Sequence, residues 1–486
     1  MSADTFFWHD YETFGTDPRK DRPAQFAGIR TDQNFNIVED PLVLYCKPHF
    51  DYLPDPESCL LTGITPNLAE SKGIIEAEFI AKIHQQMSQP GTCSLGYNTL
   101  RFDDEFTRNC LYRNFYDPYA REWQNGNSRW DLIDVVRAAA ALRPEGVVWP
   151  RDEQNKPCFR LTALTNANHL THKSAHDALS DVYATIELAK MISSAQTKLF
   201  EFLLANRFKQ KILKLLKLGT MTPVIHVSGR YPSHKNCLAI VLPLCQHPGN
   251  ANGIIVYDLS VDPEPLLSLP ADEIQQRIFT ATDQLPEGVV RIPLKTVHIN
   301  KCPVIAPISV LRPTDEERLQ LDVNYCYVQL EKLKNNYLSV VKKIESVFAA
   351  NLVTSEPDPE WALYSGGFLA DSDKLKVAKI RAATSCELKH IKTDFADPRF
   401  DTLLYRYKAR NYPDSLSKSE SENWLEFCVQ RLVGNSTSSV RTFTEFFDRL
   451  NVLKKQPEAD QLIISELENF AKNKLETLGK ATGSSL

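Results

Sequence analysis

The sequence lacks any apolar segment long enough to cross a membrane as a helix. Its longest candidate, residues 238–244, is short and contains Pro243, whereas a membrane helix needs ~18 or more uninterrupted apolar residues. Residues 1–4 include no lysine or arginine, so the basic region of a signal peptide is also missing. We therefore expect a cytoplasmic protein.

The cysteine pattern lacks the close pairs that are typical of zinc and redox sites. Eleven cysteines are scattered from Cys46 to Cys428, and none belongs to a Cys-x-x-Cys pair. An odd number of scattered thiols argues against a disulfide framework and favours a reducing compartment. The thiols therefore agree with a cytoplasmic location.

The chain also lacks an excess of positive charge. It has 56 basic and 61 acidic residues, which gives a net charge of −5. This excludes a globally basic nucleic-acid-binding protein, but it allows a local basic groove beside an acidic site, because the local field governs binding. A length of 486 residues predicts two or three domains, and no internal repeat is evident.

An apolar strand that ends in two carboxylates organises the N-terminal part of the chain. Within residues 6–15, Asp10 and Glu12 are two positions apart and therefore project from the same side of a strand. Mg²⁺ and Mn²⁺ prefer such oxygen ligands, and two ions about 3.5–4 Å apart are a known device for phosphodiester cleavage. The Thr13-Phe14-Gly15 segment is expected to turn the chain and bring its backbone and an aromatic ring close to a ligand.

This pair of acids is a weak signal when it is taken alone. The same Asp-x-Glu spacing recurs at positions 103/105, 315/317 and 358/360, so most such pairs must be ordinary solvated charges. The apolar strand before the first pair, together with the acids found downstream, favours a metal site there.

A second acidic position follows a predicted strand over residues 92–98. Asp103 lies at the start of the next helix, where an acid also interacts favourably with the helix dipole, so a simple helix-start role is the alternative. Arg108, a little over one turn later, is a candidate phosphate ligand. The aromatic residues beyond it, Tyr119 and Trp123 among them, either pack locally or stack on single-stranded bases.

A third stretch combines a histidine with an acid near a helix start. Residues 174–189 carry apolar side chains at helical spacing, which places His176 at the helix entrance and Asp181 in its second turn. An imidazole, with an ordinary pKa near ~6.5, suits a general base at neutral pH. The alternative is a surface histidine on an ordinary amphipathic helix, and His172 stands in the same relation to Asp177.

These residues fit one reaction. The four acids Asp10, Glu12, Asp103 and Asp181 would ligate two divalent ions, while His176 deprotonates the water that attacks phosphorus. Two arginines that lie between the second and third of these stretches are candidate phosphate contacts. Arg137 lies in a predicted helix and Arg160 just before another, although a surface ion pair explains Arg160 about as well.

Three motifs resemble those of the DEDDh exonucleases. They are Asp-x-Glu-Thr-x-Gly at residues 10–15, Tyr-Asn-x-x-x-Phe-Asp at residues 97–103 and His-x-Ala-x-x-Asp at residues 176–181. His172 lacks the alanine that accompanies the motif histidine, so His176 is taken as the base. Asp177 stands where the sister class carries a tyrosine.

Within that group, the chain resembles bacterial exonuclease I. The likeness depends on Thr-Phe-Gly in place of the commoner Thr-Thr-Gly, on residues 113–119, 298–303 and 406–413, and on a long C-terminal extension. It implies removal of 5′-mononucleotides from the 3′ end of single-stranded DNA with two Mg²⁺, or Mn²⁺, in repair and recombination. It also implies contact with the acidic, apolar-ended tail of single-stranded DNA-binding protein, for which Arg143 is a candidate, and we expect a monomer.

The predicted substrate contacts can be collected from the motifs and the resemblance. They are Glu12, Thr13, Phe14, Arg108, Tyr119, Trp123, Arg137, Arg160 and His176.

The predicted fold class is α/β, with three domains and a tail. An RNase H-like mixed-sheet exonuclease domain is expected over residues 1–196, and the resemblance implies an SH3-like β-rich domain over residues 197–353. An all-helical C-terminal domain is expected over residues 354–480, after a linker at 354–359, and residues 481–486 are expected to be disordered.

Several local patterns predict individual elements. They indicate a hairpin over residues 23–47, and a helix that has Thr65 as its N-cap and Pro66 as its first residue. They also indicate a helix over residues 76–87, an amphipathic stretch over 203–217 and a strand over 289–294.

Two other functions remain open at this point. One is an RNA exonuclease of the same superfamily, such as oligoribonuclease or a tRNA-trimming enzyme, although these resemble much shorter chains. The other is a non-catalytic nucleic-acid-binding or scaffold protein that kept the fold, which the presence of all five motif residues disfavours.

Overall fold

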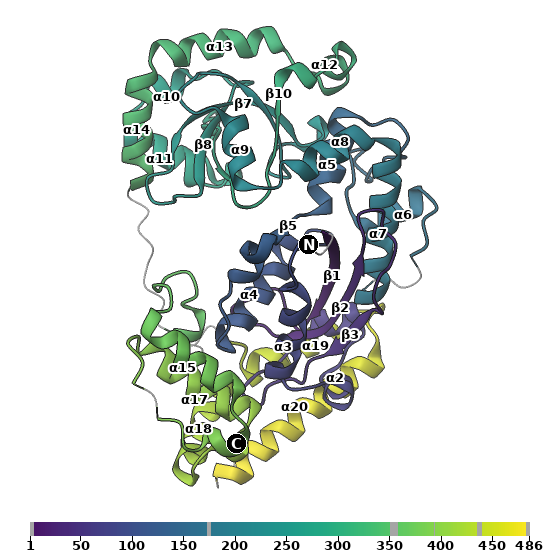
Figure 1. Cartoon of the computed structure of the whole chain (residues 1–486), viewed down its shortest axis with the longest axis vertical. Helices are drawn as coiled ribbons and strands as arrows, with labels where there is room; N and C mark the ends of the chain where they lie inside the picture. Colours follow the sequence, from purple (N-terminus) through teal and green to yellow (C-terminus); the bar gives the residue numbers. More distant parts are fainter. Residues whose placement is uncertain (1–3, 173–175, 350–357, 393, 435–439, 483–486) are drawn as a thin grey trace. The chain divides into compact units, whose positions relative to one another are not determined.

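The computed structural model describes residues 4–172, 176–349, 358–392, 394–434 and 440–482. The chain forms two compact units (Figure 1). Unit 1 comprises Met1–Asn127, Lys173–Tyr183 and Thr354–Leu486, and unit 2 comprises Ser128–His172 and Ala184–Val353. Each unit is described separately below.

Unit 1 is built on a mixed sheet. Its strands are β1 (Thr5–Thr13), β2 (Pro23–Thr31), β3 (Leu42–Tyr45) and β4 (Thr92–Leu95), which lie side by side in the order β3-β2-β1-β4. Strands β1 and β2 are antiparallel, as are β2 and β3, whereas β1 and β4 are parallel. The predicted first strand and hairpin are therefore confirmed. Because β1 is central and both its faces are covered, its consecutive residues Phe6 to His9 are all buried before the acids.

Helices α3 (Glu76–Met87) and α4 (Asp103–Arg113) cover this sheet. The predicted boundaries of α3 are confirmed, and its Phe79, Ile80 and Ile83 are buried against Phe7 and Phe26 of the sheet. Two shorter helices, α1 (Pro56–Thr62) and α2 (Pro66–Lys72), lie between β3 and α3 in the sequence.

Helix α2 begins as the sequence predicts. The Thr65 side chain accepts a hydrogen bond from the Leu68 backbone N–H, and Pro66 is the first helical residue. Proline suits this position because its missing N–H would have no partner there.

The C-terminal part of unit 1 is all-helical. Its helices are α15 (Asp371–Ala382), α16 (Ser385–Leu388), α17 (Arg399–Asn411), α18 (Lys418–Leu432), α19 (Phe443–Leu453) and α20 (Gln461–Thr482). Helix α20 contacts α1 and α2 of the N-terminal part, beside which it lies in Figure 1. The C-terminal helices share one hydrophobic core with Phe14 and Tyr52, in which the large members include Trp424, Phe446 and Leu450.

Unit 2 contains an antiparallel sheet. Its strands are β6 (Val224–Val227), β7 (Leu238–Gln246), β8 (Gly253–Asp258), β9 (Leu294–His298) and β10 (Val304–Pro307), in the order β10-β6-β7-β8-β9. The longest apolar run of the sequence, residues 238–244, is strand β7 and is buried throughout.

Unit 2 also contains helices. They are α5 (Leu132–Leu142), α6 (Leu161–Ala167), α8 (Thr197–Ala205), α9 (Lys209–Leu216), α10 (Glu264–Ser268), α11 (Ala271–Phe279), α12 (Pro313–Leu319), α13 (Val323–Asn335) and α14 (Tyr337–Ala349). The short strand β5 (Ser128–Arg129) opens the unit, and helix α7 (Ala178–Ala195) begins in unit 1 and continues into unit 2.

Two predicted elements of unit 2 are wrong. The strand expected over residues 289–294 begins only at Leu294, because Pro293 has no N–H to donate to a neighbouring strand. The amphipathic stretch over 203–217 is two helices, α8 and α9, separated at Phe208, which has an extended backbone and is 40% exposed. Its ring stacks on the Arg207 guanidinium, 4.2 Å from the ring centroid, and does not enter the core.

The predicted tail and linker have different outcomes. Helix α20 continues to Thr482, with Leu478 fully buried, so the first two residues of the expected disordered tail are helical. Residues 483–486 and the first four residues of the expected linker, 354–357, lie outside the described residues. Pro359 begins a short 3₁₀ turn, Pro359–Trp361.

The thiols and the hydropathy agree with the sequence analysis. All eleven cysteines are free. Among the described residues, no helix has both the length and the apolar character that a membrane crossing requires.

Candidate active site

The first two acids lie at the end of β1. Asp10 pairs with Ala27 of β2 and Glu12 with Gln25, so both acids are in regular strand register, and the register shifts only after Glu12. The alternation of strand side chains therefore places both carboxylates on one face. Glu12 is 7% exposed, and carboxylates are seldom buried to this extent unless they are paired.

Asp103 is brought to this pair by the start of α4. Its Oδ1 accepts a hydrogen bond of 2.9 Å from the backbone N–H of Tyr11, the residue between the two strand acids. The approach depends on Gly96, because a Cβ there would lie 2.3 Å from the carbonyl oxygen of His9. Asp103 is thus both the first residue of α4 and a neighbour of the acidic pair.

His176 and Asp181 join Glu12 in one cluster of possible ligand groups. One ligand atom from each of these three side chains lies within 4.8 Å of the other two. Helix α7 begins at Ala178, whose N–H donates to the Gln25 side chain of β2. Asp181 is therefore in the first turn of α7, and not in the second as predicted.

The two histidines of this region have different surroundings. His176 precedes the helix in a left-handed backbone conformation, with φ of 64°, and it belongs to the cluster with Glu12 and Asp181. His172 instead lies 3.2 Å from the Thr165 hydroxyl, a contact within unit 2. The geometry therefore favours His176 over His172, as the accompanying alanine predicted.

The pKa values of the acids report their mutual repulsion. Burial, followed by the charges of Asp103, Glu12 and Asp181, raises the pKa of Asp10 well above its ordinary value. Burial and the charges of Asp181 and Asp177 raise the pKa of Glu12 to about 8. Four carboxylates that oppose one another's ionisation in this way would be stabilised by cations.

Asp177 is a residue that the sequence analysis missed. It was not assigned to the site, yet its charge acts on both Asp10 and Glu12. Its Oδ1 also accepts a hydrogen bond from the Ser180 N–H, at 3.0 Å, in the first turn of α7. An aspartate that directly precedes a helix and accepts a hydrogen bond from a first-turn backbone N–H is a common helix start. That signal was present in the sequence.

The donor set fits hard divalent cations. Asp10, Glu12, Asp103 and Asp181 offer carboxylate oxygens from three different elements, and such ligands suit Mg²⁺ or Mn²⁺. His176 adds a nitrogen beside Glu12 and Asp181, which hard ions do not need and which therefore remains available for proton transfer.

Replacing Glu12 by glutamine is expected to stabilise the metal-free protein at alkaline pH. Because the folded pKa of about 8 exceeds the ordinary value, Glu12 adds stability to the wild type as the pH falls from about 8 to 4.5, and the variant lacks this contribution. The variant's advantage should thus be greatest above pH 8, at roughly 3–5 kcal/mol, since one pKa unit is about 1.4 kcal/mol. Urea unfolding in chelator across this pH range measures it.

The half-buried Glu187, which pairs with Lys190 on α7, provides the control. Glu187→Gln should change stability by less than ~0.5 kcal/mol at any pH. A Glu12→Gln variant that is no more stable than wild type above pH 8 would contradict the repulsion described here.

The loop after Glu12 differs from the prediction in one respect. Phe14 is 1% exposed, and its ring packs in the core that the C-terminal helices share. The expectation that this ring lies close to a ligand is therefore wrong, and only the backbone of Phe14 remains a candidate contact. The Thr13 hydroxyl donates to the Gly15 carbonyl oxygen at 2.7 Å, which fixes the turn.

Arg108 has structural partners. Its Nε and Nη2 donate to the Glu122 carboxylate, at 2.7 and 2.9 Å, and its Nη1 donates to Glu105 and to the Tyr364 hydroxyl. The guanidinium is also buried. These contacts occupy the groups that a phosphate would need, so we do not assign Arg108 to the substrate.

The aromatic segment contributes both packed and exposed rings. Tyr119 lies under the Arg108 guanidinium, 5.3 Å from the ring centroid, whereas Trp123 is 65% exposed. The arginines between the rings are structural, since Arg113 is paired with Glu76 and Arg121 with Asp104. Trp123 is the ring with the most surface to offer to a base.

The remaining predicted residues belong to unit 2. Arg137 donates to Asp134 one turn earlier in α5, at 2.9 Å, and Arg160 is exposed immediately before α6. Arg143 donates to the carbonyl oxygens of Leu142 and Val310. Arg160 is thus the freest of these three side chains to meet an anion.

The fold and the acidic cluster define a nuclease of the exonuclease class. Residues 7–189 match the family model described as Exonuclease. Two further models match the rest of the chain, the Exonuclease I SH3-like domain over residues 207–350 and the Exonuclease I C-terminal domain over residues 357–474. The chain belongs to the exonuclease I family, as the sequence motifs predicted.

Curated and solved relatives agree with this assignment. Exodeoxyribonuclease I of Escherichia coli (strain K12) is 47% identical over 423 residues, which cover 87% of this chain and 88% of the relative. Exonuclease I from Methylocaldum szegediense is 49% identical, with a TM-score of 0.92 over 97% of this chain and 100% of that one. E. coli exonuclease I in complex with a dA16 oligonucleotide is 43% identical over the same shares, also with a TM-score of 0.92.

Two more structures of relatives show bound species. A zinc-bound form of the E. coli enzyme with single-stranded DNA has a TM-score of 0.92 at 43% identity, and a structure of SSB with exonuclease I and an inhibitor has one of 0.88 at 42%. Both cover 97% of this chain and 100% of the other. The predicted fold class, an exonuclease domain followed by an SH3-like and a C-terminal domain, is thus confirmed.

Proposed function

We propose that this protein is a metal-dependent 3′-to-5′ exonuclease that degrades single-stranded DNA to 5′-mononucleotides. The main support for this proposal is that Asp10, Glu12, Asp103 and Asp181 lie close together, so that neighbouring charges raise the pKa values of Asp10 and Glu12. His176 lies beside two of these acids, Glu12 and Asp181. Membership of the exonuclease I family and the oligonucleotide complexes of its relatives support DNA as the substrate.

The four acids would hold two divalent cations, Mg²⁺ or Mn²⁺. When bound, such ions supply charge neutralisation at the phosphate and help to activate water. Since the acids lie on β1, α4 and α7, the fold brings them together before any ion binds. The zinc-bound relative supports the use of a divalent cation in the family.

His176 acts as the general base in this proposal. Its ring nitrogen accepts the proton of the attacking water, and the ring lies beside Glu12 and Asp181, two of the carboxylates that would hold the cations. Its place before α7, outside the regular helix, leaves the ring free to exchange that proton with solvent.

Substrate contacts follow from exposure and charge. Trp123, with Tyr119 beside it, would stack on bases, while Thr13 and the backbone of Phe14 lie next to Glu12 and would border the terminal nucleotide. Arg137 and Arg160 would contact phosphates. As domain boundaries we propose residues 1–196, 197–353 and 354–480, with a short tail after them.

The cellular role is proposed from the relatives. The structure of SSB with exonuclease I supports the tail of single-stranded DNA-binding protein as a partner, with Arg143 as a candidate contact. A nuclease that consumes single strands from their 3′ ends would act in DNA repair and recombination.

Mononucleotide release from a 3′-labelled DNA strand is the test of this function. With Mg²⁺, we expect release from the 3′ end and slower cleavage of an RNA oligonucleotide of matched sequence; with chelator, release should cease because the acids then lack their cations. Faster cleavage of RNA would favour the RNA exonuclease alternative. Binding of DNA without release in Mg²⁺ or Mn²⁺ would favour a non-catalytic protein.

A further inference from the structure

The loop that follows the strand acids is held closed by contacts of its own. It comprises residues 14–22, and the Phe14 N–H donates to the Arg22 carbonyl oxygen at 2.9 Å where β2 is about to begin. Within the loop, the Asp21 carboxylate accepts from the Asp17 N–H at 2.9 Å. That carboxylate also occupies the place of a side chain at Gly15, where a Cβ would lie 2.1 Å from the Asp21 Cγ. The loop is therefore tightly packed against itself.

Arg22 links this loop to the C-terminal helices. Its Nη1 donates to the carbonyl oxygens of Lys20 and Asp21, at 3.0 and 3.2 Å, and its Nε donates to His49 at 3.1 Å. Its Nη2 donates to Glu360, which lies 338 positions later in the chain, at 2.5 Å. Arg22 and Glu360 are both almost fully buried, so the pair is shielded from water and salt.

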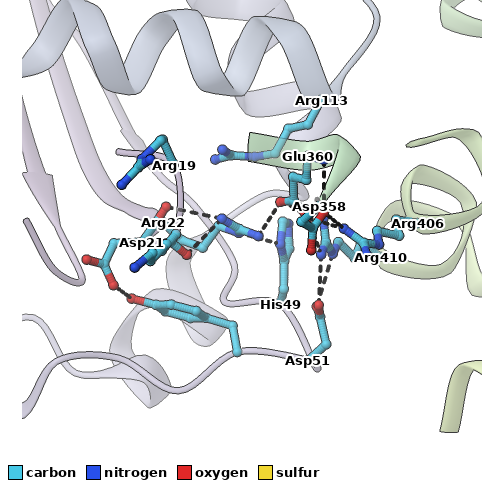
Figure 2. Close-up of polar contacts among 12 residues, drawn as sticks. Arg19, Asp21, Arg22, His49, Asp51, Arg113, Asp358, Glu360, Arg406 and Arg410 are labelled. Atoms are coloured by element: carbon cyan, nitrogen blue, oxygen red, sulfur yellow. Dashed lines mark hydrogen bonds and ion pairs between the residues drawn. The ribbon is translucent and has the colours of Figure 1, made fainter. Parts of the chain in front are cut away.

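Glu360 is in turn fixed by two arginines of α17. Arg410 donates to both of its carboxylate oxygens, at 3.0 and 2.9 Å, and Arg406 to one of them at 3.1 Å. Figure 2 shows the Glu360 carboxylate between Arg22 and these two arginines. Arg410 also forms a two-fold contact with the fully buried Asp51 of the N-terminal part, at 3.0 and 2.8 Å. Although burial alone would raise its pKa, the guanidinium groups of Arg22, Arg410 and Arg406 hold the pKa of Glu360 well below its ordinary value.

The loop has a second anchor at Tyr52. The Tyr52 hydroxyl lies 2.8 Å from the Phe14 carbonyl oxygen and 2.8 Å from Asp21 Oδ1. The Phe14 ring enters the core of the C-terminal helices beside the Tyr52 ring. Residues 14–22 are thus held by the C-terminal part through two contacts. These are the Arg22–Glu360 ion pair and the packing of the Phe14 ring.

We propose that Glu360 is a positioning residue for the active site, acting through Arg22 on the loop that follows Glu12. The C-terminal helices are then part of the catalytic apparatus, because they set where β1 ends and hence where the Glu12 carboxylate stands. This inference rests on the proposed function for its activity measurements. Outer-shell partners of metal ligands typically change metal affinity or activity by about 10–100-fold when they are replaced.

Glu360→Gln is the primary variant, because it keeps the size of the side chain and removes its charge. We expect kcat for nucleotide release to fall about tenfold with KM for DNA nearly unchanged, since Trp123, Arg137 and Arg160, the proposed base and phosphate contacts, lie outside this loop. Mn²⁺ binding, followed by electron paramagnetic resonance, should weaken by about the same factor. Glu360→Asp, which keeps the charge, should restore part of both.

Matched variants separate positioning from lost stability. Asp373 is a fully buried carboxylate of the C-terminal helices that binds Lys376 and the Ala396 N–H, so Asp373→Asn should lower Tm without lowering kcat or Mn²⁺ affinity. Where Glu360→Gln does not fold, Tyr52→Phe removes one hydroxyl from the other anchor. Its control is Tyr405→Phe, which removes a hydroxyl that donates to the Glu420 carbonyl oxygen.

Each outcome has a definite meaning. Unchanged kcat and Mn²⁺ affinity in a folded Glu360→Gln or Tyr52→Phe variant would overturn the inference, as would equal losses in the matched controls. A wild type that releases no nucleotides would instead refute the proposed function, and the Mn²⁺ measurement would still test the positioning of Glu12 by Glu360.

Discussion

Replacing Asp10 by alanine is expected to reduce mononucleotide release from single-stranded DNA by about 10³-fold or more. Asp10 lies at the centre of the acidic cluster, since the charges of Asp103, Glu12 and Asp181 all act on it. Cations in such a site contribute several kcal/mol of transition-state stabilisation, and each 1.4 kcal/mol corresponds to a factor of ten in rate. Initial rates on a 3′-labelled strand, with protein in excess for the variant, measure the loss.

The fold of this variant should survive. Removing one of several mutually repelling acids relieves repulsion and desolvation, so Asp10→Ala should unfold at a temperature equal to or above that of the wild type in chelator. Asp40→Ala, at an exposed position, is the control and should keep full activity. Full activity in Asp10→Ala would refute a mechanism that depends on cations held by this cluster.

Replacing His176 by alanine is expected to slow nucleotide release by about 10²–10⁴-fold, the range over which a positioned general base contributes. The loss should fall on kcat, because the histidine acts on the proton of the attacking water. The acid limb of the pH–rate profile should also disappear, since the base must be deprotonated to act. Rates measured from pH 5.5 to 9 in saturating Mg²⁺ check both effects.

Two comparisons make the role of His176 specific. His172→Ala should leave the rate and its pH dependence unchanged, because His172 contacts Thr165 and is absent from the cluster found around Glu12. Mn²⁺ binding to His176→Ala should equal that of the wild type. A parallel loss of Mn²⁺ affinity would show that His176 is a ligand, and the assignment as a base would then be wrong.

The local parts of the site were predictable from the sequence. Strand alternation places Asp10 and Glu12 together, and the helix-start pattern places Asp103 in a first turn and Asp181 near the start of the next helix, because these geometries depend on residues within one or two turns of each other. The error in the start of α7 is a boundary error of the same local kind.

The parts that failed depend on partners far along the chain. The ring after Glu12 looked like a ligand contact, yet Phe14 packs with residues of α18 and α19. Arg108 looked like a phosphate ligand, yet Glu122 and Tyr364 bind it. Nothing near Arg22 in the sequence indicates that Glu360 completes its contacts, because an ion pair over such a separation leaves no periodic pattern.

Because Phe14 shares a core with the C-terminal helices, the nuclease part is not expected to be stable when it is separated from them. A chain that ended before residue 358 would leave Phe14, Tyr52 and Leu53 without Trp424, Phe446 and Leu450, with which they are buried. Such a cut would expose a contiguous apolar patch, and patches of that kind promote aggregation. Without the C-terminal helices, the nuclease part would therefore lose part of the core on which the loop after Glu12 is packed.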